Sequence, residues 1–145
     1  MKKLMKVMYY LGLSLSMAVG IWHFFVPHLY QWYDYLPMQY ENLIVGIDYT
    51  NYFFSLLLTG LSLLLILSGK KAFAANREII VFYGFLAFVW LNRALITFVH
   101  PWPLEPVEWA AHGQQIAAII IFLLLAASFV YLLRKLRSQK GKAAK

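Results

Sequence analysis

Four long apolar stretches dominate this chain and restrict what it can fold into. They cover residues 7–26, 43–67, 79–99 and 115–133. Each has roughly the 20 residues that a helix needs to cross the hydrocarbon core of a bilayer. Inside that core only helices and closed barrels satisfy every backbone polar group, and continuous apolar runs of this length are typical of helices. We therefore predict an all-α, polytopic membrane protein whose single domain, residues 1–145, is an antiparallel four-helix transmembrane bundle.

The composition agrees with a membrane location and removes one kind of chemistry. Hydrophobic residues make up 62% of the chain and charged residues only 13%, whereas soluble domains carry about 25% charged residues. There is no cysteine, which excludes disulfides, thiolate metal sites and thiol redox chemistry. The first apolar stretch follows three lysines like a secretory signal, but it continues through "VGIWHFFVP", which favours a retained span.

The basic residues predict the orientation of the bundle. Lysines and arginines precede the first span, lie between the second and third, and fill the tail at 134–145, whereas the loops at 27–42 and 100–114 contain none. By the positive-inside rule both termini are cytoplasmic and the two loops face outward. The net charge of +7 is then an orientation signal that also attracts anionic membrane lipids, and it does not indicate nucleic acid.

One arginine and one aspartate lie inside the apolar stretches. Arg93 is about six residues from the outer end of the third, and Asp48 about five residues inside the outer start of the second, so both lie roughly 8 Å below the outer surface. An unpaired charge at mid-bilayer costs at least about 2.5 kcal/mol on insertion scales. We predict an ion pair between Asp48 and Arg93, with arginine favoured for its forked donors. A purely architectural pair, or an Arg93 side chain extending to the headgroups, are the alternatives.

Further polar residues of all four predicted helices lie at this depth, beneath outer loops rich in tyrosine and tryptophan. Aromatic rings with a polar edge favour the headgroup layer. Convergent polar groups under an apolar cover are typical of a ligand pocket. We predict an outer-leaflet binding pocket made by the following residues: His23, Asp48, Asn51, Asn92, Arg93 and Gln115.

Two patterns of small residues have a simpler interpretation as helix contacts. Gly12, Ser16 and Gly20 recur every four residues, which lets another backbone approach closely. A polar stripe below Asp48, made by Ser55, Thr59 and Ser62, is also more typical of packing than of a conduit.

The segments "GIWHFFVP", "YLP" and "NRALITFVHPWPLEPVEW" resemble the DoxX-like family of small four-helix bacterial membrane proteins, over roughly residues 12–130. The resemblance implies a four-helix bundle and, for the sulfur-oxidising members, a subunit of a quinone-linked oxidoreductase. "GIDYTNYF" departs from the Gly and Glu pattern of the family's second helix, with Asp48 in place of the acid. The positions that match the family pattern are Gly20, His23, Phe24, Pro27, Asn92, His100 and Pro101.

Three functional hypotheses follow. The first is a protein that binds a quinone or a lipid-like molecule through Arg93, Asn92 and His23, with electrons supplied by a membrane redox partner. The second is an accessory or assembly subunit without catalysis, and the third, less favoured, is a transporter. Candidate partners are membrane lipids, a redox subunit and further copies of the chain.

Neither a catalytic residue nor a metal site is assigned from the sequence, and whether the chain is itself an enzyme stays open. No covalently bound cofactor is predicted, and a quinone is the candidate cofactor. A surface metal site made by His100 and His112 with Glu105 or Glu108 is disfavoured because the spacing matches no known ligand pattern.

Overall fold

The computed structural model describes residues 1–36, 39–101 and 108–143, and their regular structure is helical. The helices are α1 (Lys2–His23), α2 (Val26–Leu29), α3 (Trp32–Tyr35), α4 (Glu41–Leu67), α5 (Gly69–Phe73), α6 (Arg77–Val99) and α7 (Glu108–Ala143). Four of them, α1, α4, α6 and the stretch His112–Gln139 of α7, are long and apolar enough to cross a membrane. The predicted all-α, multi-pass membrane fold is therefore confirmed.

Helix boundaries differ from the predicted spans mainly where polar residues continue a helix beyond its apolar part. The last helix is the clearest case, because α7 runs from Glu108 to Ala143 rather than over 115–133. The first span ends earlier than predicted: α1 stops at His23, three residues before the end of the apolar run. Pro27 in α2 explains this end, because proline has no N–H to continue the i→i−4 ladder onto His23.

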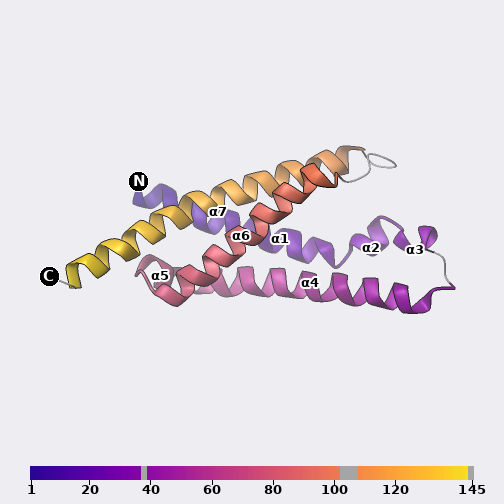
Figure 1. Ribbon diagram of the computed structural model, residues 1–145, viewed down its shortest axis with the longest axis horizontal. Helices are drawn as coiled ribbons and strands as arrows, with labels where there is room; N and C mark the ends of the chain where they lie inside the picture. Colours follow the sequence, from indigo (N-terminus) through magenta and orange to yellow (C-terminus); the bar gives the residue numbers. More distant parts are fainter. Residues whose placement is uncertain (37–38, 102–107, 144–145) are drawn as a thin grey trace.

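Helix α1 lies at the centre of the packing, in contact with both α4 and α7, while α6 packs mainly along α7. Figure 1 shows both chain ends and α5 at the left of the bundle, with α2 and α3 at the right. It also shows that α6 leaves the α5 end beside α4 and then crosses away from it toward α7. The consecutive long helices α4 and α6 are therefore close at the α5 end of the bundle but apart at the right-hand end.

Small residues let α1 approach its neighbours closely, as predicted. A Cβ atom at Gly20 would lie 2.8 Å from the backbone nitrogen of Thr59 in α4, and one at Gly12 would lie 3.0 Å from Leu125 in α7. The serine between these glycines is fully buried and links three helices: Ser16 is 2.9 Å from Ser62 Oγ and accepts a hydrogen bond of 2.9 Å from Trp90 Nε1. These polar groups therefore serve helix packing.

Aromatic rings fill the half of the core nearest the chain ends. Tyr9 stacks on Tyr83 with ring centroids 4.6 Å apart and meets the edge of Phe73. Both buried hydroxyls have partners, because Tyr9 donates to the Leu65 carbonyl and Tyr83 shares a hydrogen bond with Ser128. This half is tightly packed, so the candidate binding region lies toward the opposite end of the helices.

Candidate binding site

Two cavities adjoin one another near the end of α1 that is opposite the chain termini. Their volumes are about 210 Å³ and about 650 Å³. The side chains that line both of them are Trp22, His23, Arg93 and Gln114. We call these two spaces the Arg93 cavities. They combine one guanidinium with mostly apolar walls, which is the usual character of a small-molecule site.

Arg93 enters this region from α6 and is half-buried. Its guanidinium donates a hydrogen bond of 2.8 Å to the side-chain oxygen of Gln114 in α7. Among the side chains that the structure describes, no carboxylate lies within ion-pair distance of it. A neutral amide satisfies one N–H group but brings no negative charge, so within the described residues the guanidinium has no counter-ion and the cavities favour an acceptor or an anion.

The predicted ion pair between Asp48 and Arg93 is wrong. Asp48 instead accepts a hydrogen bond of 2.7 Å from the hydroxyl of Tyr33 in α3. The prediction failed because it assumed that consecutive helices stay adjacent at this depth. In the structure α4 follows α1, whereas α6 crosses toward α7, so Arg93 meets a residue of α7 (Figure 1).

Asn51 lines the larger Arg93 cavity, as predicted, and it also holds the end of α1 in place. Its side-chain nitrogen donates a hydrogen bond of 2.9 Å to the backbone carbonyl of His23, the last residue of α1. In a continuing helix this carbonyl would accept from the residue four positions later, but that residue is Pro27, which has no N–H. Asn51 therefore satisfies an acceptor that the proline leaves open, and it fixes the end of α1 to α4.

Replacing Asn51 by leucine is expected to lower the free energy of unfolding by about 1–3 kcal/mol, because the half-buried carbonyl of His23 loses its donor. The measurement is reversible unfolding of purified protein in mixed micelles. In a Pro27→Ala background the same substitution is expected to cost less, since alanine restores a backbone donor for this carbonyl. Equal costs in the two backgrounds would show that the proline does not create the need for Asn51.

Two further predicted site residues, Asn92 and Gln115, are absent from the lining of the Arg93 cavities. Asn92 is exposed, and its side chain donates to the Phe88 carbonyl of its own helix. Gln115 is half-buried, but it is the preceding residue, Gln114, that receives the hydrogen bond from Arg93. One residue along a helix turns a side chain by about 100°, and the sequence pattern did not fix the rotation of α7.

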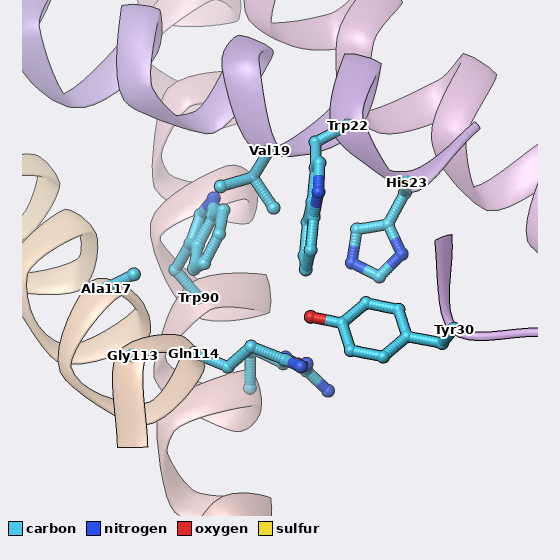
Figure 2. A pocket seen from close by; sticks show the side chains of 9 residues that line it. Val19, Trp22, His23, Tyr30, Trp90, Gly113, Gln114 and Ala117 are labelled. Carbon is cyan, nitrogen blue, oxygen red and sulfur yellow. The ribbon is translucent and has the colours of Figure 1, made fainter. Parts of the chain in front are cut away.

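Aromatic side chains outside the predicted set of site residues form a large part of the walls. Figure 2 shows the Trp22 ring between Trp90 and the rings of His23 and Tyr30, with the Tyr30 hydroxyl directed into the space below it. The Trp22 ring meets both neighbours edge to face, with centroids 5.5 Å from His23 and 6.0 Å from Tyr30. His23 thus lines the cavities as predicted, within an aromatic wall.

The described residues offer little for metal or nucleophilic chemistry. No group of three or more His, Asp or Glu side chains suited to a metal is found among them. The side chains of Glu105 and Glu108 lie outside the described residues, so the surface metal site stays untested. Ser55 donates to the carbonyl of Asn51 in its own helix, and Ser62 pairs with Ser16. The arrangement is suited to binding rather than to attack on a substrate.

Comparisons with models of protein families, with curated proteins and with solved structures found no match to this chain.

Proposed function

We propose that this protein binds an amphipathic molecule, a quinone or a lipid-like compound, in the Arg93 cavities of the outer leaflet. The observation that carries the proposal is the position of Arg93, which lines both cavities and whose partner among the described side chains is the neutral Gln114. A ligand carbonyl or phosphate would supply a further acceptor for the guanidinium. The apolar walls would hold a ring or an acyl chain.

The larger cavity supports a ligand that arrives from the bilayer. Its volume of about 650 Å³ is within the range of about 300–1,000 Å³ that is typical of small-molecule sites. Leu43 and Phe54 of α4 line it and are exposed on the bundle surface, which in a membrane faces acyl chains. A lipid-soluble molecule can therefore reach Arg93 laterally, from the acyl-chain layer of the bilayer. We also propose, from the lysine distribution, that the chain ends are cytoplasmic, and, from the DoxX-like resemblance, that the membrane is a bacterial inner membrane.

The DoxX-like resemblance favours a quinone, and with it a redox partner subunit. In that version His23, which lines both cavities, would exchange the proton that accompanies quinone reduction. The chain has no cysteine to ligate an iron–sulfur cluster, so electrons would come from the partner.

Replacing Arg93 by glutamine is expected to weaken binding of decylubiquinone about tenfold to a hundredfold, because one charge-assisted hydrogen bond is lost. Quenching of tryptophan fluorescence measures the affinity, since Trp22 and Trp90 line the cavities. Small molecules that co-purify with the wild type, identified by mass spectrometry, are expected to be depleted in the variant. The matched control is Arg77→Gln, at the exposed start of α6.

The same experiment separates the proposal from an accessory subunit. If folded Arg93→Gln protein keeps the wild-type affinity and the same co-purified molecules, the binding proposal fails. If Arg93→Gln prevents folding while Arg77→Gln does not, Arg93 has the structural role that an accessory subunit requires.

A further inference from the structure

A third cavity, of about 570 Å³, surrounds Asp48, and we call it the Asp48 cavity. Its lining shares Asn51 with the larger Arg93 cavity but does not include Arg93. Aromatic rings from the end of α1 and from α2, α3 and α4 form most of its walls. These rings belong to Phe24, His28, Tyr33, Tyr49, Tyr52 and Phe53.

The walls of this cavity are held in place by local contacts. Between α2 and α3 the backbone of Gln31 adopts a left-handed conformation, with φ of 51°, and α3 follows directly. Tyr33 of α3 then donates its hydroxyl to Asp48, and its ring lies 5.9 Å from that of His28. The pKa of Tyr33 is raised, mainly because the hydroxyl donates to Asp48. On the other side, the Phe24 and Tyr52 rings meet edge to face at 5.5 Å.

The negative charge of Asp48 has no cationic partner in the described part of the chain. There is no lysine or arginine between residues 7 and 69, a range that includes every residue lining the cavity. Arg93 of α6 donates its hydrogen bond to Gln114 and lines the other two cavities. Tyr33 supplies a neutral hydrogen bond, which leaves the charge uncompensated.

A carboxylate among aromatic rings is the chemistry that recognises an organic cation. The face of an aromatic ring attracts an ammonium group, and a carboxylate adds a direct charge interaction. The exposed rings of Tyr49 and Tyr52 leave this cavity accessible from the surface of the bundle. We propose that the Asp48 cavity binds an organic ammonium group, carried either by an outer-leaflet lipid headgroup or by a soluble amine. This site is separate from the Arg93 cavities and does not depend on their function.

The first arm of the test uses a soluble probe. Equilibrium dialysis of the full-length protein in a non-ionic detergent measures binding of choline and of 3,3-dimethyl-1-butanol, a neutral molecule of the same shape. Choline is expected to bind at least about tenfold more tightly than the alcohol. Asp48→Asn, which keeps an acceptor for Tyr33 but removes the charge, is expected to abolish this preference. The matched control is Asp34→Asn, an exposed acid in α3.

The second arm identifies a lipid source. Native mass spectrometry compares retention of phosphatidylethanolamine, which has an ammonium group, with that of phosphatidylglycerol, which has none. A preference for the ethanolamine lipid that Asp48→Asn removes and Asp34→Asn keeps would identify a lipid headgroup. A preference seen only for choline would identify a soluble amine. If Asp48→Asn matches the wild type in both arms, or if neither choline nor the ethanolamine lipid is preferred over its partner molecule, the proposal is overturned.

A variant that removes one ring covers the case in which Asp48→Asn does not fold. Tyr52 is largely exposed, so Tyr52→Leu is expected to leave the fold intact while weakening the binding of choline or of phosphatidylethanolamine. Unchanged binding by folded Tyr52→Leu in both arms would contradict an aromatic cage.

Discussion

Gly20→Ala is expected to destabilise the bundle by about 3 kcal/mol, the upper part of the range for overpacked sites. The added Cβ would lie 2.5 Å from Thr59 Oγ1 and 2.8 Å from the Thr59 backbone nitrogen, so α1 and α4 must separate to admit it. Alanine also gains about 1 kcal/mol in helix propensity over glycine, which the steric cost exceeds. The measurement is the free energy of unfolding in mixed micelles of increasing denaturing detergent.

Two variants show whether close helix approach is the cause. Gly60→Ala makes the same change in α4, where a Cβ would meet no atom within 4 Å, and is expected to change stability by less than about 1 kcal/mol. Adding Thr59→Ala to Gly20→Ala is expected to recover only part of the loss, because the backbone of Thr59 remains in the way. If Gly20→Ala and Gly60→Ala have equal effects, α1 and α4 do not require this glycine.

The packing of α1 is the part of the structure that the sequence predicts best, after the number and type of the helices. Hydropathy fixes which segments cross a membrane, because the cost of burying polar groups in lipid is large and local. The four-residue spacing of Gly12, Ser16 and Gly20 identifies the contact face of α1, and the structure places α4 and α7 against it. These signals depend on residues within one helix.

The candidate site was predicted less well because it depends on which helices meet and how each is rotated. Arg93 and His23 line a shared cavity as expected, but Asp48 belongs to a separate cavity. Matching depth in the membrane does not determine lateral distance. Choosing Gln114 over Gln115 requires the rotation of α7 about its axis, and no periodicity in so uniformly apolar a helix reveals it. The role of Asn51 was detectable, since Pro27 deprives the His23 carbonyl of its helical donor.

Trp90→Ala is expected to have a still larger effect, a loss of about 3–5 kcal/mol in the free energy of unfolding. The Trp90 side chain is only 4% exposed, and its indole nitrogen donates to Ser16 at the point where α1, α4 and α6 meet. Truncation removes a large apolar volume and also a donor to a fully buried hydroxyl. The same unfolding measurement tests it, with Trp32→Ala, a half-buried residue of the short α3, as the control.

Trp90→Phe separates the two contributions. Phenylalanine keeps most of the ring volume but has no N–H, so the expected loss is much smaller, with about 1 kcal/mol from the hydrogen bond. Ser16 and Ser62 remain 2.9 Å apart and still satisfy one another.

Because Trp90 also lines the smaller Arg93 cavity, a bound ligand would fill part of the space left by alanine. The cost of Trp90→Ala should therefore fall when decylubiquinone is added, and a cost that is unchanged at saturating quinone would place the ligand elsewhere.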